Sequence, residues 1–241
     1  PRGEKQMKIT YFGHSAFRIE TGDAVIMLDP FLSGNPLFKG DVREAARGAT
    51  HVLLTHGHDD HLGDTVDICK ATGATLVANF EIAMYLAAKG VANYSPGNHG
   101  GRISFADFDC VFTNAWHSSS HVDNGTPIYL GNPAGFVVLP RKEKGKSLYV
   151  SGDTGITYDM KIIQDLYKPV FGIVCIGDRF TMGPDQAAHA CKTFFKFKKV
   201  IPCHFATFEG FLVPDAKPFV KAMGPKGKTV TVMKPGEAVA L

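Results

Sequence analysis

Residues 55–64, THGHDDHLGD, directly follow the apolar run HVLL at residues 51–54. A run of Val and Leu that ends in glycine-punctuated polar residues is typical of a buried strand followed by a loop. Within six residues the stretch holds four potential ligands, His56, His58, Asp60 and His61. Strand geometry would direct the first two imidazoles to one side, and the loop would return the other two side chains toward them. Imidazole and carboxylate groups bind zinc and similar ions, so the stretch predicts two neighbouring metal sites rather than a solvated turn.

Length and composition predict a single domain over residues 1–241. The chain is 44% hydrophobic, which is enough for one large core. Its net charge is +3, and its basic residues are spread along the sequence. The longest basic cluster, RKEKGK at residues 141–146, is interrupted by Glu143 and Gly145 and is typical of a hairpin turn. We therefore expect a small-molecule substrate as the partner and do not favour nucleic acid. The oligomeric state stays open between a monomer and a homo-oligomer.

The cysteines and the apolar runs predict a cytoplasmic location. The five cysteines are odd in number and show no CxxC spacing, which argues against a disulfide framework and against a thiolate zinc site. They fit a reducing compartment. Residues 2–6, RGEKQ, are followed by alternation rather than by an apolar run, and no apolar run reaches membrane-spanning length. We expect neither a signal peptide nor a membrane partner.

The remaining pattern predicts strands first and then helices that alternate with strands. Alternation and short apolar runs predict strands at residues 7–11, 16–20, 24–28, 51–54, 74–78, 102–105, 110–115, 135–139, 147–150, 170–176, 199–202 and 229–233. Helices are predicted near residues 41–47, 64–72, 80–89, 158–167, 184–195 and 215–223. Residues 31–40 and 118–133 are expected to be loops. This order indicates packed sheets with helices outside.

Three further candidate ligands each follow a predicted strand. His117 follows residues 110–115, Asp153 follows residues 147–150, and His204 follows residues 199–202. Strand ends along one edge of a sheet converge, so residues far apart in the sequence meet over one cavity. We expect these three side chains to join the histidine-rich stretch at one site.

The HxHxDH pattern, followed by His, Asp and His at these separations, resembles the metallo-β-lactamase superfamily. More narrowly, the chain is similar to small bacterial metal-dependent hydrolases of that superfamily, which are similar to ascorbate-6-phosphate lactonase. The shared phrases run almost from end to end: YFGHSAF (residues 11–17), LDPF (28–31), THGHDDHLGD (55–64), HSS (117–119), GDTG (152–155), DM (159–160), GDRFTMG (177–183), PCH (202–204) and TF (207–208). The resemblance implies an α+β fold, a four-layer αββα sandwich with the metals at one edge.

The resemblance also implies a role for each candidate ligand. Seven side chains would hold two divalent ions: His56, His58 and His117 the first, Asp60, His61 and His204 the second, and Asp153 both. Dioxygen-reducing di-iron relatives carry Glu at the second position of the pattern, where this chain has His58, so a hydrolytic site is expected. Zinc suits these ligands, while manganese, iron and nickel are acceptable to the same atoms.

Two such cations about 3.5 to 4 Å apart lower the pKa of a shared water toward about 7 and polarise a carbonyl or phosphoryl oxygen. The expected activity is hydrolysis of a small cytoplasmic metabolite, a lactone or a phosphorylated ester, by a binuclear-metal-bound hydroxide. Asp60 would be the catalytic residue that orients the hydroxide and passes a proton to the leaving group. Two alternatives stay open. The same ions would serve a phosphodiesterase or a nuclease, although no dense basic stretch supports one, and a non-catalytic metal-binding protein would have the same fold.

Several other polar residues have two interpretations each. His14 lies in a Gly-His-Ser turn and either binds a substrate oxygen or satisfies the turn backbone. Asp29 either accepts a hydrogen bond from a ligand histidine or caps the turn before Pro30. Arg179 follows a buried strand and either binds a substrate phosphate or carboxylate or forms an internal ion pair. The histidines without supporting spacing are interpreted as surface or core residues: His51, His99, His121 and His189.

Overall fold

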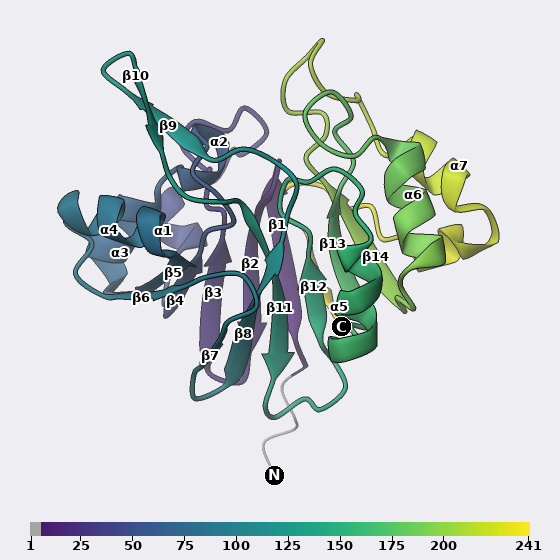
Figure 1. The fold of residues 1–241 in the computed structure, drawn as a ribbon, viewed down its shortest axis with the longest axis horizontal. Coiled ribbons are helices and arrows are strands. Elements are labelled where there is room, and N and C mark those ends of the chain that lie inside the picture. Colours follow the sequence, from purple (N-terminus) through teal and green to yellow (C-terminus); the bar gives the residue numbers. More distant parts are fainter. Residues whose placement is uncertain (1–5) are drawn as a thin grey trace.

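Two mixed β-sheets face each other in the middle of the molecule, and helices cover both outer faces (Figure 1). The computed structural model describes residues 6–241. Residues 1–5, which carry part of the signal-peptide prediction, lie outside the described residues. Across residues 6–241, no helix combines the length and the apolar character that crossing a bilayer requires.

The first sheet comes mainly from the N-terminal part of the chain. In spatial order its strands are β15 (Ala238–Ala240), β1 (Lys8–Gly13), β2 (Ala16–Thr21), β3 (Ala24–Leu28), β4 (His51–Leu53), β5 (Thr75–Asn79) and β6 (Tyr94–Gly97). The strands from β15 to β3 are antiparallel, and those from β3 to β6 are parallel. The helices that accompany it are α1 (Val42–Ala45), α2 (Asp59–Leu62), α3 (Thr65–Thr72) and α4 (Phe80–Ala88) (Figure 1).

The second sheet comes from the C-terminal part of the chain. In spatial order its strands are β14 (Lys199–Cys203), β13 (Phe171–Cys175), β12 (Leu148–Val150), β11 (Ala134–Pro140), β8 (Phe108–Asn114) and β7 (Arg102–Ser104). The strands β12, β13 and β14 run parallel, while the rest pair antiparallel. Its outer face carries α5 (Asp159–Tyr167), α6 (Pro184–Thr193) and α7 (Lys217–Met223) (Figure 1).

The main hydrophobic core lies between the two sheets. Phe17 of β2 and Phe136 of β11 are fully buried there, and the rings of Phe112 and Phe136 lie edge to face with 5.2 Å between their centres. Side chains alternate along a strand. The strand β3 therefore directs Ile26 into this core and Met27 into a second cluster beneath the helices of the first sheet. These layers confirm the prediction of an α+β four-layer αββα sandwich.

The prediction of a loop over residues 118–133 is wrong in part, because the segment contains a hairpin. Its strands are β9 (Ser120–Asp123) and β10 (Thr126–Tyr129). Asn124 and Gly125 join them with φ angles of 48° and 80°. Two positive φ angles in succession suit the two-residue turn that matches the twist of a hairpin, and Asn-Gly is its preferred sequence.

The strand predicted over residues 229–233 is also wrong. Within the described chain, Val230 is the residue of this segment that forms a bridge, parallel to Val200, after the 3-10 helix η1 (Gly224–Thr229). The chain then turns at Gly236, whose φ angle is 90°, and places β15 beside β1. The β-propensity of Val and Thr depends on the neighbours that a strand finds, and here the segment meets the edge strand β14 only around Val200.

The substitution Phe136→Ala tests the core between the sheets. We expect it to lower the free energy of unfolding by about 3 to 5 kcal/mol, because it removes a buried ring and leaves a cavity. Urea unfolding followed by circular dichroism measures the change. Phe180→Ala is the matched control, since that ring is 51% exposed. It should change the same quantity by less than about 0.5 kcal/mol. An equally small effect of Phe136→Ala would contradict the packing of the sheets.

Candidate metal centre

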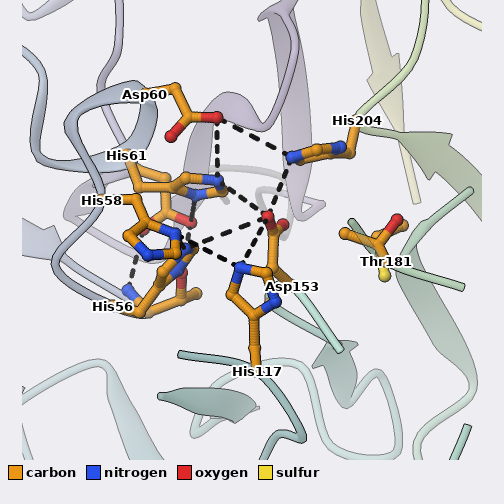
Figure 2. Close-up of polar contacts among 12 residues, drawn as sticks. His56, His58, Asp60, His61, His117, Asp153, Thr181 and His204 are labelled. Atoms are coloured by element: carbon orange, nitrogen blue, oxygen red, sulfur yellow. Dashed lines mark hydrogen bonds and ion pairs between the residues drawn. The ribbon is translucent and has the colours of Figure 1, made fainter. Parts of the chain in front are cut away.

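Polar side chains from both sheets meet where the strands end (Figure 2). The first sheet supplies its members from the loop after β4 and from α2, and the second sheet supplies them from the segments after β8, β12 and β14. The two sheets thus bring together all seven residues predicted as ligands: His56, His58, Asp60, His61, His117, Asp153 and His204.

The carboxylate of Asp153 lies at the centre of this cluster (Figure 2). The side chain is buried, with 2% of the residue exposed. Its Oδ2 atom approaches the Nε2 atoms of four histidines, at 2.8 Å from His204, 3.3 Å from His61, 3.7 Å from His117 and 3.9 Å from His56. One oxygen therefore faces both ends of the cluster, which is the position that a bridging ligand needs.

The cluster has two halves on either side of Asp153. In the first half, His58 Nδ1 lies 3.0 Å from His56 Nε2 and 3.2 Å from His117 Nε2. In the second half, a carboxylate approaches two imidazoles: Asp60 Oδ2 lies 3.8 Å from His204 Nε2 and 3.9 Å from His61 Nε2. The halves have the same members as the two predicted ligand sets, and metal binding by them stays a prediction.

Three buried atoms of the cluster, His61 Nε2, Asp153 Oδ1 and His204 Nδ1, have no hydrogen-bond partner within residues 6–241. A buried polar atom without a partner costs about 1 to 3 kcal/mol. A divalent cation among the ring nitrogens and carboxylate oxygens would satisfy such atoms, and these donors are ones that zinc and similar ions accept. The residues present therefore fit a divalent metal centre.

Asp29, which follows β3, orients two of the candidate ligands. Its Oδ2 atom accepts hydrogen bonds from His61 Nδ1 at 2.8 Å and from the Thr55 hydroxyl at 2.6 Å, and its Oδ1 atom accepts the Thr55 backbone N–H at 2.8 Å. The Thr55 hydroxyl also lies 3.0 Å from His56 Nδ1. The geometry supports Asp29 as the acceptor for a ligand histidine. Sequence reasoning missed Thr55, whose signal is its place directly before His56.

Burial and neighbouring charges both shift the pKa values of the candidate ligands, and for Asp153 and His61 they act in opposite directions. Burial and the neighbouring His61 lower the pKa of His56 well below its ordinary value, so that imidazole is neutral and able to bind a metal. Burial opposes the charged form of Asp153, but His204 and His61 hold its pKa well below the usual range. Burial also opposes a charge on His61, but Asp153 and Asp29 raise its pKa well above the ordinary value. A metal ion would replace that proton, so metal binding is expected to release protons.

Backbone contacts hold the ligand-bearing segments against one another. The Trp116 N–H donates to the Thr154 hydroxyl at 2.9 Å, which joins the segments after β8 and β12. The Met182 N–H donates to the Thr154 carbonyl at 2.8 Å, which adds the segment after β13. A Cβ atom on Gly177 would lie 2.6 Å from His204 Nδ1, so only glycine lets the imidazole pack against this segment.

The two residues predicted to contact substrate lie in different surroundings. His14 is fully buried, with Nε2 2.9 Å from Asp60 Oδ2 and Nδ1 2.9 Å from the Thr207 hydroxyl. Arg179 is exposed, and its guanidinium carbon lies 4.9 Å from the centre of the Phe211 ring and 5.7 Å from that of Phe180. Among the described residues, its contacts are thus with aromatic rings rather than with a carboxylate. Substrate contact stays a prediction for both residues.

The histidines without supporting spacing lie outside the cluster. Each has a partner of its own: His51 packs against Phe105 and Phe108, His99 Nε2 donates to the Pro133 carbonyl, His121 pairs with Asp59, and His189 lies near the Phe194 ring. Their interpretation as surface or core residues is confirmed.

Residues 24–205 match a family model described as a beta-lactamase superfamily domain. The match spans most of the chain and includes every residue of the cluster. The chain belongs to the metallo-β-lactamase superfamily. The family, the fold and the resemblance drawn from the ligand pattern are therefore confirmed together.

Relatives in the metallo-β-lactamase superfamily carry hydrolase names. A UPF0173 metal-dependent hydrolase from Methylocella silvestris is 54% identical over 224 residues, which cover 93% of this chain and 95% of the relative. A UPF0173 metal-dependent hydrolase from a Chelativorans species is 52% identical over 237 residues, which cover 98% of this chain and 100% of the relative. Igni18, a metallo hydrolase from the archaeon Ignicoccus hospitalis, is 33% identical with a TM-score of 0.86 and covers 98% of this chain and 99% of its own. At the level of the family, the prediction of a metal-dependent hydrolase is confirmed.

The substitution Asp29→Asn tests how far this carboxylate supports the metal centre. We expect metal affinity to fall by about 10-fold to 100-fold, because the amide cannot accept all the hydrogen bonds that orient His61 and Thr55. Competition against a chromogenic chelator measures the affinity. Asp67→Asn is the control, since it removes an exposed carboxylate of α3. Equal affinities of the two variants would contradict the orienting role of Asp29.

Proposed function

We propose that this member of the metallo-β-lactamase superfamily hydrolyses a small cytoplasmic metabolite, a lactone or a phosphorylated ester, with the help of two divalent ions. The observation that carries the proposal is the position of Asp153 Oδ2 between two groups of closely spaced ring nitrogens and carboxylate oxygens. A single ion needs about four ligands, whereas this cluster offers seven. The surplus supports a binuclear site.

In this proposal the ligand sets follow the two halves of the cluster: His56, His58 and His117 would hold one ion, Asp60, His61 and His204 would hold the other, and Asp153 would contribute to both. When bound, the ions would supply an activated water and a positive charge beside a carbonyl or phosphoryl oxygen. Zinc is the proposed ion because it prefers these donors, with manganese, iron and nickel as acceptable replacements.

Asp60 is the proposed catalytic residue. Its side chain is 28% exposed, so it faces solvent as well as the cluster, whereas the Asp153 side chain is 3% exposed. Burial opposes its charged form, but His61 and His14 keep the pKa of Asp60 below the usual range. An ionised carboxylate at the open side of the site can accept a hydrogen bond from the attacking water and then pass a proton to the leaving group.

Arg179 is the proposed anchor for an anionic group of the substrate. The turn after β13 is closed by the Thr181 N–H, which donates to the Asp178 carbonyl at 2.6 Å, so Arg179 and Phe180 lie at its tip. The Phe180 and Phe211 rings are stacked, with an interplanar angle of 16° and 6.4 Å between their centres. A guanidinium held by aromatic faces keeps its N–H donors free for a phosphate or carboxylate. This feature supports a phosphorylated or carboxylated substrate.

Metal analysis tests the binuclear site. We expect protein purified without chelator to contain close to two divalent ions per chain, and a variant with both His56→Ala and His58→Ala to lose ions, because two ligands of one set are gone. Elemental analysis measures the content and identifies the metal. If the protein binds no metal tightly, even after loading with zinc or manganese, this result would contradict the mechanism and favour the non-catalytic alternative.

The substitution Asp60→Asn tests the catalytic role. We expect kcat to fall by about 100-fold or more, because an amide neither orients the water as a carboxylate does nor carries a proton to the leaving group. Turnover is measured across a panel of lactones, phosphorylated esters and phosphodiesters, with the far-ultraviolet circular dichroism spectrum as a check on the fold. Activity near that of the unchanged protein would remove Asp60 from the mechanism.

A further inference from the structure

Two sequence segments lie beside the candidate metal centre without supplying a predicted ligand. The Gly-His-Ser turn joins β1 to β2, and Thr207 follows the last candidate ligand by three residues. We propose that His14 and Thr207 form a hydrogen-bonded pair that holds the Asp60 carboxylate in place for the second metal ion. His14 is then a positioning residue rather than a ligand or a substrate contact. The inference rests on the proposed binuclear site.

The hydrogen-bonding groups of the pair are fully matched. His14 Nε2 lies 2.9 Å from Asp60 Oδ2, and His14 Nδ1 lies 2.9 Å from the Thr207 hydroxyl. An ionised carboxylate only accepts hydrogen bonds, so Nε2 donates to it. A neutral imidazole then has Nδ1 as an acceptor. In this proposal the Thr207 hydroxyl directs its one hydrogen to Nδ1 at 2.9 Å rather than to its other acceptor, the Phe205 carbonyl, at 3.2 Å. Each ring nitrogen has one partner of the right kind, and the ring therefore has one favoured orientation.

The backbone of His14 contacts another candidate ligand. Its carbonyl accepts the His204 N–H at 2.8 Å, and the two imidazole rings lie 4.2 Å apart between centres. The φ angle of His14 is 56°, in the left-handed region that non-glycine residues rarely adopt. His14 thus contacts Asp60 through its side chain and His204 through its backbone. It therefore fixes the relative positions of Asp60 and His204, two ligands of the second ion that come from different sheets.

The alternative that His14 itself binds the ion has less support. Its Nε2 atom does group with atoms of Asp60, His61 and His204. The contact of Nε2 with a carboxylate at 2.9 Å does not separate the two roles, because His204 Nε2 lies 2.8 Å from Asp153 Oδ2. A single ion needs about four ligands, however, and Asp60, His61, His204 and Asp153 already supply that number for the second ion. The Phe31 and Phe208 rings lie 5.9 Å and 5.3 Å from the His14 ring, and the residue is 0% exposed. This enclosure also separates the imidazole from substrate.

Stepwise cobalt binding tests the proposal. Metal-free protein is titrated with Co²⁺ alone, and the dissociation constants of the two ions are taken from the visible absorption of the bound metal. The variant His58→Ala, which removes a ligand of the first set alone, assigns each constant to its ligand set, so that the second ion is the one held by Asp60, His61 and His204. We expect His14→Ala to weaken the second ion by about 10-fold to 100-fold and to change the first by less than about twofold. His14→Gln keeps an N–H donor near the place of Nε2 but has no imidazole, so it should recover most of the loss. His99→Ala is the control, since it removes a histidine that lies outside the cluster.

The Thr207 variants give a second test that does not depend on how well the His14 variants fold. Thr207→Val, which removes the hydroxyl at nearly constant volume, should weaken the second ion by about threefold to tenfold, while Thr207→Ser should bind both ions as the unchanged protein does.

Three results would overturn the proposal. The first is a dissociation constant for the second ion that stays the same in His14→Ala or in Thr207→Val. The second is an equal loss in His14→Gln and His14→Ala, which would make His14 a ligand. The third is equal weakening of both ions, which would indicate general damage. Failure of the binuclear site itself is distinguishable, because the unchanged protein would then bind fewer than two cobalt ions before any variant is compared.

Discussion

The structure depends on the burial of a charged carboxylate, that of Asp153, whose loss of contact with water a hydrophobic core cannot offset. Asp153 is 2% exposed, and it shares its surroundings with imidazoles that are also buried. A carboxylate taken out of water costs several kcal/mol unless charges and hydrogen bonds compensate it. Here the compensation comes from ring nitrogens around Oδ2 and, in the proposed function, from metal ions. This compensation is available only where strands from both sheets end, so the site can form only when the two sheets are packed together.

Much of the candidate site could be predicted because its spacing is local or follows strand ends. The histidine-rich stretch follows a buried strand as predicted, but β4 ends at Leu53, before the first two histidines, and Asp60 and His61 lie on α2 rather than on a loop. The ligands His117, Asp153 and His204 lie within three residues of the ends of β8, β12 and β14. Partners beyond the ligands were accessible only in part, since the sequence offered Asp29 as one interpretation of the acceptor for a ligand histidine but did not indicate Thr55 or Thr207. The contact of His14 with Thr207 joins residues that only the packed sheets bring together, while that of Asp29 with Thr55 depends on the pairing of β3 with β4.

Most of the layers of the fold were predicted, and the misses have separate physical causes. The hairpin at residues 118–133 carries a signal, Asn124 followed by Gly125, which the polar composition of the segment concealed. The segment at residues 229–233 has good β-propensity, but propensity does not tell which sheet edge is free. The edge strand β6 contains Pro96 and Gly97, residues that are depleted in strands, so its pairing with β5 has no clear sequence signal.

Because the candidate ligands come from both sheets, the order in which the fold and the metal site form is constrained. The first sheet carries His56, His58, Asp60 and His61, while the second carries the other three ligands. Neither half of the cluster is complete within one sheet, since His117 belongs with the first half and His204 with the second. A metal ion bound by such a set is a cross-link between sheets that form from separate parts of the chain. In the proposed binuclear site, full ligation would follow only after the sheets have docked, so the ions would be acquired at the end of folding rather than at its beginning.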